Sequence, residues 1–168
     1  MPATDHAELL APAVASFLAS WPHASDVMVA AIDPDLADTA AFCERYEVPL
    51  EASANCVVIE GRRGEMTRRA ACLVLATDRA DVNGVVRRRL DARKASFAAM
   101  DQAVGDTAME YGGITPLGLP VKWPILVDDA VVAVELVVIG SGLRRSKLAL
   151  PGRLLAELPS AEVLALHL

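Results

Sequence analysis

The centre of the chain carries two apolar segments of strand-like composition joined by a short polar stretch. Residues 56–60 read CVVIE and residues 70–76 read AACLVLA. Apolar runs of this length, bounded by turn signals, are typical of buried strands. The stretch between them contains Gly61 and Gly64, at which the chain can reverse. We therefore predict two strands joined by a long, glycine-bounded hairpin.

Helical and extended patterns alternate over the rest of the chain. Apolar residues at helical spacing predict helices over residues 5–20 and 36–47, with a buried strand over residues 27–32 between them. The other expected helices cover residues 81–91, 99–109 and 151–158, and the other expected strands cover residues 96–98, 124–127, 131–139 and 147–150. Some strands adjoin and others are separated by helices, so the predicted fold class is α/β, with a mixed, curved or barrel-like sheet covered by helices.

Size and composition point to one globular domain. A chain of 168 residues, 54% of them hydrophobic, can bury a sizeable core. Its glycines and prolines are dispersed, so we expect a single domain over residues 1–168, in which residues 1–24 form a helical N-terminal extension. The chain starts without the positive region of a signal peptide, and its longest apolar run is too short for a membrane span. This predicts a cytoplasmic protein with no membrane partner.

The residue types that bind metals or act as nucleophiles are few and scattered. Cys43, Cys56 and Cys72 form no CxxC motif, and the three histidines are spread over the two ends of the chain. We therefore predict reduced core thiols, no metal site and no Ser-His-Asp triad. No strand is followed by GxGxxG or by a P-loop, which disfavours a nucleotide-dependent enzyme.

The basic residues are concentrated in one part of an otherwise acidic chain. The net charge is −6, yet residues 62–94 carry ten basic and four acidic side chains. These residues form a surface for nucleic-acid phosphates if the fold gathers them with the basic residues at 144–147. The alternative is that they are the solvated faces of a hairpin and a helix.

Two glycine-rich turns are the most distinctive local features. Residues 112–120 read GGITPLGLP, with three glycines and two prolines in nine residues. A loop of this fixed shape can aim backbone N–H groups at a ligand, or it can be a tight connection from a helix to a strand. Residues 140–142 read GSG, follow an apolar strand and precede LRRSK. A β-turn explains this second segment as well as phosphate binding does.

These features occur in the order found in a known family. The apolar strand near residue 56, GGITPLG at 112–118, VDD at 127–129 and VIGSG at 138–142, followed by RRSKLAL, resemble the YbaK/EbsC-like family. That family comprises free-standing aminoacyl-tRNA deacylases and the related editing domain inserted in bacterial prolyl-tRNA synthetases. The resemblance covers about residues 25–168 and implies a YbaK-like fold.

What the resemblance implies is trans-editing, the hydrolysis of the ester that joins a wrongly attached amino acid to the 3′-terminal adenosine of a tRNA. An aminoacyl ester is already activated. A pocket that positions it, donates backbone hydrogen bonds to the developing oxyanion and admits water therefore needs no side-chain nucleophile and no cofactor. The implied partners are the acceptor end of a mischarged tRNA and an aminoacyl-tRNA synthetase.

The resemblance also assigns roles to individual residues. The implied catalytic residues are Asn55, Gly112, Gly113 and Pro116. The implied substrate-binding residues are Ile114, Thr115, Gly118, Asp128, Gly140, Ser141 and Gly142. For Asp128 the alternative is a structural role, as the cap of a helix before Ala130. The expected tRNA-binding residues are Arg87, Arg88, Arg89, Lys94, Arg144, Arg145 and Lys147.

Asn55 is a departure from the family, which has a lysine at the start of this strand. An asparagine can hydrogen-bond a carbonyl or hydroxyl group but supplies no charge. Two hypotheses follow. The first is a deacylase, in which Lys94 and Lys122 are the candidates to replace the lost charge. The second is a module that binds tRNA or a small ligand, keeps the pocket and has lost catalysis.

Overall fold

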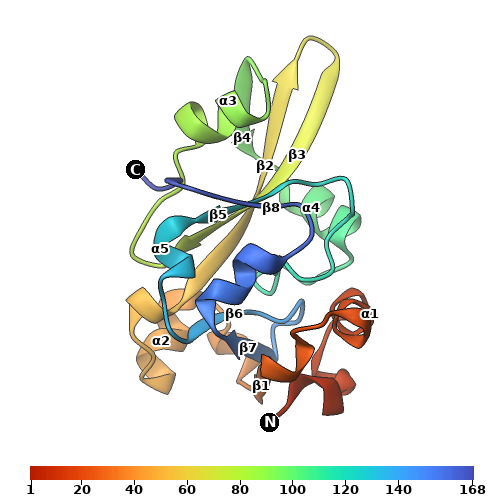
Figure 1. Cartoon of the computed structure of the whole chain (residues 1–168), viewed down its shortest axis with the longest axis vertical. Helices are drawn as coiled ribbons and strands as arrows, with labels where there is room; N and C mark the ends of the chain where they lie inside the picture. Colours follow the sequence, from red (N-terminus) through yellow and green to blue (C-terminus); the bar gives the residue numbers. More distant parts are fainter.

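The computed structural model describes all 168 residues and contains two β-sheets (Figure 1). One sheet has the strand order β4-β2-β3-β5-β8, and the other has the order β1-β7-β6. An isolated bridge between Ser53 and Val138 joins them. The strands are β1 (Met28–Ala31), β2 (Ala54–Arg63), β3 (Met66–Leu75), β4 (Lys94–Phe97), β5 (Ile125–Asp128), β6 (Val137–Gly140), β7 (Ser146–Leu150) and β8 (Ala161–Leu164).

The larger sheet is mixed, as the sequence predicts. Strand β2 runs antiparallel to β3 and β4, whereas β5 runs parallel to both β3 and β8. In the smaller sheet all pairs are antiparallel. The predicted α/β fold is therefore confirmed. Both sheets stay open, so the curved arrangement does not close into a barrel.

Short helices surround the sheets (Figure 1). The α-helices are α1 (Pro12–Ser20), α2 (Thr39–Tyr46), α3 (Arg87–Arg89), α4 (Met100–Thr107) and α5 (Asp129–Val132). A π-helical turn covers Val82–Val86, and 3-10 turns cover Ala3–Asp5, Ala7–Leu9, Ala24–Asp26, Pro34–Leu36, Leu50–Ala52 and Gly152–Glu157. None of the helices combines the length and apolar character that a membrane span requires.

The central hairpin is present, but its strands are longer and its turn is tighter than predicted. Strands β2 and β3 have ten residues each and stay in register up to the pair Arg63 and Met66. The reversal takes only Gly64 and Glu65, and Gly64 has a φ of +60°. The outer part of the hairpin extends beyond the core (Figure 1), so its strands can carry exposed arginines without burying charge.

Other elements differ from prediction for local reasons. The apolar run at 131–139 is not one strand: it begins in α5 and ends in β6, because periodicity does not separate a short buried helix from a buried strand. The expected helix over residues 5–20 is shorter in the structure. Its α-helix, α1, begins at Pro12, and proline is suited to the first helical position. The segment 81–91 is divided into a π-turn and α3. Strand β8 was not predicted.

The inner part of strand β3, from Ala70 to Leu75, is buried on both faces and organises the core. Ala71, Leu73 and Leu75 belong to a cluster that includes α1 and the smaller sheet. The alternate residues Cys72 and Val74 belong to a second cluster, with partners from residues 82–92 and the C-terminal segment. Because successive side chains of a strand point to opposite faces, this apolar strand supports two layers at once.

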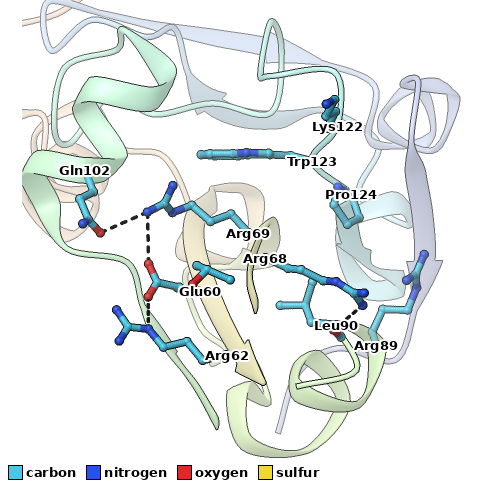
Figure 2. A pocket seen from close by; sticks show the side chains of 11 residues that line it. Glu60, Arg62, Arg68, Arg69, Arg89, Leu90, Gln102, Lys122, Trp123 and Pro124 are labelled. Carbon is cyan, nitrogen blue, oxygen red and sulfur yellow. Dashed lines mark hydrogen bonds and ion pairs between the residues drawn. The ribbon is translucent and has the colours of Figure 1, made fainter. Parts of the chain in front are cut away.

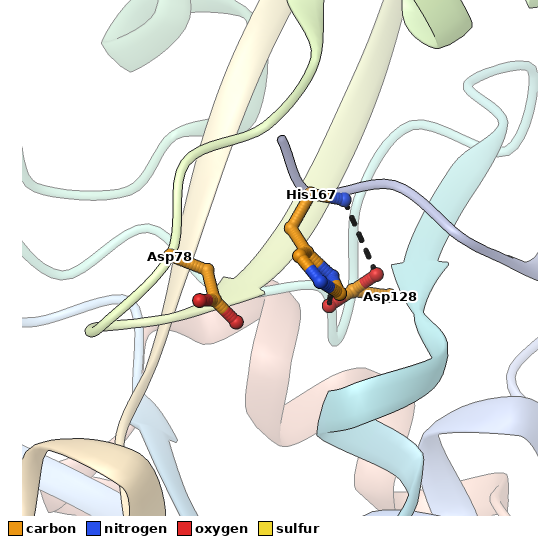
Figure 3. Close-up of side chains that lie close together, drawn as sticks. All are labelled: Asp78, Asp128 and His167. Carbon is orange, nitrogen blue, oxygen red and sulfur yellow. Dashed lines mark hydrogen bonds and ion pairs between the residues drawn. The ribbon is translucent and has the colours of Figure 1, made fainter.

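The C-terminal segment is held by a buried carboxylate (Figure 3). Asp128 is 0% exposed, and its Oδ1 accepts hydrogen bonds from the backbone N–H groups of Leu166 (2.8 Å) and His167 (3.3 Å). Its Oδ2 accepts from His167 Nδ1 at 2.7 Å. Asp128 precedes α5 but makes no side-chain bond to that helix. Asp128 therefore occupies the expected N-cap position of α5, but its side chain does not cap the helix, because the C-terminal segment takes up both carboxylate oxygens.

Asp78 joins this cluster, and ligand-type atoms of Asp78, Asp128 and His167 lie within 4.8 Å of one another. The hydrogen bond to Asp128 and the negative charges of Asp128, Asp78 and Asp129 raise the pKa of His167 above its ordinary value of 6.5. The protonated imidazole therefore stabilises the docked C-terminal segment.

We expect the free energy of unfolding to decrease as the pH rises from about 6.5 through the raised pKa of His167. Below that range both the folded and the unfolded chain are protonated. Within it, the unfolded chain has lost its proton first, so the stabilisation is progressively lost. Urea unfolding from about pH 6 to about pH 9 measures this. In His167→Asn the decrease should be absent; an identical pH slope in both proteins would contradict the assignment.

Candidate active site

A cavity of about 360 Å³ opens where the start of β2 faces the loop that follows α4. Its walls come from five parts of the chain: the start of α2, the start of β2, the β4–α4 connection, the 111–114 loop, and the paired strands β6 and β7. Most of its lining is apolar. The lining residues with polar side chains are Asp38, Thr39, Asn55, Cys56, Tyr111 and Lys147.

The structure brings together part of the predicted site. Asn55, Gly112, Ile114, Gly140 and Lys147 all line this cavity. A second set lies outside the lining: Gly113, Thr115, Pro116, Gly118, Ser141 and Gly142, of which all but Gly118 are buried. Asp128 also lies outside it and has the C-terminal contact described above. The predicted residues therefore divide into a lining and a supporting layer.

Two glycine turns lie directly against each other in the supporting layer. A Cβ added at Gly140 would lie 2.5 Å from the carbonyl oxygen of Gly113. One added at Gly113 would lie 2.8 Å from the carbonyl group of Leu143. The Gly142 N–H also donates to the Gly113 carbonyl at 2.7 Å. Backbone packs on backbone here, and a side chain at Gly113 or Gly140 would separate the two turns.

Ser141 has a structural position within the second turn. Its Oγ lies 2.6 Å from Ser146 Oγ and accepts a hydrogen bond from the Leu143 N–H at 3.2 Å. Ser146 Oγ in turn donates to the carbonyl of Leu9. Both hydroxyls are buried, so Ser141 holds the turn and does not face the cavity.

The first glycine loop contains backbone N–H groups that are not used within the protein. Neither Gly112 nor Ile114 donates its N–H to an acceptor of the protein, although both residues line the cavity. The Gly113 N–H is used, since it donates to the Glu110 carbonyl. Unpaired N–H groups beside a cavity are suited to binding a carbonyl oxygen or an oxyanion.

Asn55 has a fixed orientation. Thr39 donates its hydroxyl hydrogen to Asn55 Oδ1, from the first residue of α2 to the second residue of β2. Because the amide oxygen is taken, the Nδ2 group of Asn55 is the part available to a bound molecule. The site therefore has a neutral donor at this position.

Lys147, on the paired strand β7, is the cationic residue of the lining, and it also lines a second, apolar hollow together with Phe42. Its ammonium Nζ lies 5.3 Å from the centre of the Phe42 ring. Burial lowers the pKa of Lys147 below its ordinary value of 10.5, and the nearby Arg144 lowers it further; Cys43 and Asp38 act in the opposite direction. Sequence reasoning placed Lys147 on a tRNA-binding surface. The signal for a buried role was its position in SKLAL, a strand whose other residues are small or apolar.

The thiol in the cavity is not an activated nucleophile. Burial, with a smaller effect of Cys72, raises the pKa of Cys56 well above its ordinary value of 9.0. The thiolate, which is the reactive form, is therefore disfavoured. No histidine lines the cavity. The lining thus fits a site that positions a substrate and binds its charge.

The other predicted basic residues do not form one patch. Arg144 donates to the carbonyls of Tyr111 and Pro34 beside the cavity, and Arg145 donates to the carbonyl of Glu8. Arg87 bonds to its own turn, whereas Arg88 and Lys94 are exposed. Arg89 and Lys122 line a different, larger hollow. Neither Lys94 nor Lys122 reaches the cavity beside Asn55.

Comparisons with known proteins agree with this geometry. Residues 33–158 match the family described as the aminoacyl-tRNA editing domain. A candidate trans-editing enzyme for prolyl-tRNA synthetase shares the fold with a TM-score of 0.79 and 18% identity, over 94% of this chain and 96% of its own. A hypothetical protein of known structure has a TM-score of 0.75 and 17% identity, over 84% of this chain and 91% of its own. No curated protein matches the sequence significantly.

We expect Gly113→Ala and Gly140→Ala each to lower the free energy of unfolding by about 1–3 kcal/mol, because an added methyl group forces the two turns apart. The matched control is Gly105→Ala, at an exposed helical glycine where an added Cβ meets nothing within 4 Å. That variant should gain about 0.5–1 kcal/mol. Denaturant unfolding measures all three, and equal stabilities would show that the turns separate without cost.

Proposed function

Because the chain belongs to the aminoacyl-tRNA editing domain family, we propose that it hydrolyses the ester bond between a wrongly attached amino acid and the 3′-terminal adenosine of a tRNA. The observation that carries this proposal is the cavity itself. Its mostly apolar lining includes two residues with unpaired backbone N–H groups, the neutral amide of Asn55, the half-buried Lys147 and the carboxylate of Asp38. Its volume is within the range of about 300–1,000 Å³ that small-molecule sites occupy.

Each group has a role in the proposed reaction. The N–H groups of Gly112 and Ile114 donate to the carbonyl oxygen of the ester as it becomes an oxyanion. Asn55 Nδ2 donates to a hydroxyl or carbonyl of the substrate and fixes its orientation. The Lys147 ammonium stabilises the developing negative charge, and the low dielectric around it strengthens that interaction. Water, or a hydroxyl group of the substrate itself, supplies the attacking oxygen.

The buried lysine favours catalysis over the binding-only alternative. That alternative was suggested by the neutral Asn55, which removes the charge that the family has on β2. In this chain a lysine on β7 lines the same cavity. We therefore propose a deacylase whose cationic residue lies on β7 and not on β2.

The test is a set of tRNAs mischarged with alanine, serine, threonine or cysteine, assayed for release of the amino acid. We expect release faster than spontaneous hydrolysis from at least one of them. Saturable binding without release would support the binding-only alternative. Neither binding nor release with any member of the set would refute the proposal.

Removing the ammonium group should affect turnover more than folding. We expect Lys147→Met to lower kcat by about 10²-fold, the loss typical for one oxyanion-stabilising group. In the unmodified protein, the enzymatic rate should also fall as the pH rises through the lowered pKa of Lys147, because the charged form is the active one. The variant should lack this fall. The control is Lys94→Met, an exposed lysine outside the cavity, which should retain both kcat and the pH profile.

A charge exchange tests whether the origin of the cation matters. Asn55→Lys alone should reduce activity, because two ammonium groups would share one partly buried cavity. Combining Asn55→Lys with Lys147→Met leaves a single cation, now on β2. We expect the double variant to be more active than Lys147→Met alone, measured as kcat on the same mischarged tRNA. A double variant no better than the single one would show that the β7 position is required.

A further inference from the structure

A second hollow, of about 700 Å³, lies beside the outer half of the β2–β3 hairpin. Its lining contains five cationic side chains, Arg62, Arg68, Arg69, Arg89 and Lys122, and one carboxylate, Glu60. Figure 2 shows these side chains around one open space, with Trp123 across it from the arginines. A chain with a net charge of −6 thus gathers a strongly positive concave surface.

The ion pairs within the hollow fix the arginines but do not neutralise the surface. Glu60 accepts from Arg62 Nε at 2.6 Å and from Arg69 Nη2 at 3.2 Å, and its side chain is only 7% exposed. These contacts, led by Arg62, lower the pKa of Glu60, so it stays charged and holds both guanidinium groups. Asp106 also pairs with Arg69, and Glu162 pairs with Arg89.

Two cations remain without a carboxylate partner. Arg68 donates only to the carbonyl of Leu90, and Lys122 is exposed and forms no ion pair. Both residues line the same hollow. The ligand that fits this arrangement is an extended anion with several charges, since the fixed arginines can share hydrogen bonds with it and the two free cations can pair with it.

Trp123 narrows the class of ligand to a nucleic acid. Its ring is partly exposed and borders the hollow, and in Figure 2 it presents a flat side toward Arg69. Cationic grooves that contain an exposed aromatic ring are typical of nucleic-acid sites, because phosphates pair with the cations and a base stacks on the ring. An acidic protein segment has carboxylates for the cations but no base to stack on the ring.

The hollow and the cavity occupy successive stretches of the same elements. Residues 54–58 of β2 line the cavity, whereas Glu60 and Arg62 line the hollow. On α4, Met100 and Ala103 face the cavity and Gln102 faces the hollow. Val58 of the cavity and Glu60 of the hollow are two residues apart on the same face of β2, a rise of about 7 Å. A nucleic acid that reaches both sites therefore needs to extend over only a short distance.

We propose that this basic hollow binds the phosphate backbone of the tRNA whose aminoacylated end enters the cavity, with a base against Trp123. This inference rests on the proposed function for the identity of the nucleic acid. It also revises the expected tRNA-binding set: Arg62, Arg68, Arg69 and Lys122 join Arg89, whereas Arg87, Arg88 and Lys94 lie outside the hollow.

The test is a titration with uncharged tRNA, which measures binding without the reaction. Binding should quench the fluorescence of Trp123, and Trp123→Phe should abolish the quenching although Trp21 remains. The double variant Arg68→Gln, Lys122→Gln should weaken binding and reduce the slope of log Kd against log salt by about 1.5, as expected for two lost phosphate contacts. The matched control is Arg79→Gln, Arg153→Gln, which removes the same charge from exposed positions outside the hollow.

Equal weakening by the two double variants would overturn the proposal, since it would reveal attraction to overall charge. So would binding of polyglutamate as tight as that of tRNA, or the absence of quenching. Hydrolysis of a small ester such as an aminoacyl adenosine tests the deacylase proposal separately, because this substrate has no tRNA backbone to contact the hollow. The Arg68→Gln, Lys122→Gln variant should hydrolyse it at the normal rate. Hydrolysis without tRNA binding in the hollow would refute only the docking surface.

Discussion

The contact between two backbone segments at Gly113 and Gly140 sets the geometry on which the cavity depends. No side chain lies between these turns, so the 112–116 loop packs directly against the end of β6. In this position the N–H groups of Gly112 and Ile114, two residues that line the cavity, have no acceptor within the protein. The contact also brings Lys147, the strand partner of Gly140, to the same space. A backbone contact thus determines where donors and charge meet.

The charged groups of the cavity are Lys147 and Asp38 in its lining and Arg144, which pairs with Asp38, beside it. Lys147 is desolvated, and the opposing influence of Asp38 and Cys43 offsets this only in part. Cys56 stays a thiol, and Asn55 is neutral and tied to Thr39. A partly buried cation interacts more strongly with a nearby negative charge than it would in water, because the effective dielectric constant around it is lower.

Strand β2 connects this chemistry to the basic surface. Its inner half, from Ala54 to Val58, lines the apolar cavity, whereas its outer half carries the buried Glu60 and the exposed Arg62 into the basic hollow. One regular strand therefore borders first the apolar cavity and then the basic hollow. The rigidity of the hairpin, paired residue by residue with β3, keeps the two surfaces at a constant separation.

The sequence by itself determined the mixed α/β class, the central hairpin and the two glycine turns, because these depend on local composition and on strand periodicity. It could not show that the 131–139 run divides into a helix and a strand. Short apolar runs occur in buried helices and in buried strands, and their periodicity does not separate the two. The sequence also could not show which basic residue enters the cavity. Lys147 and Arg145 are two residues apart, yet one reaches the cavity and the other bonds to Glu8. Only the pairing of β7 with β6 decides that difference, because contacts between distant segments determine which side chains are buried together.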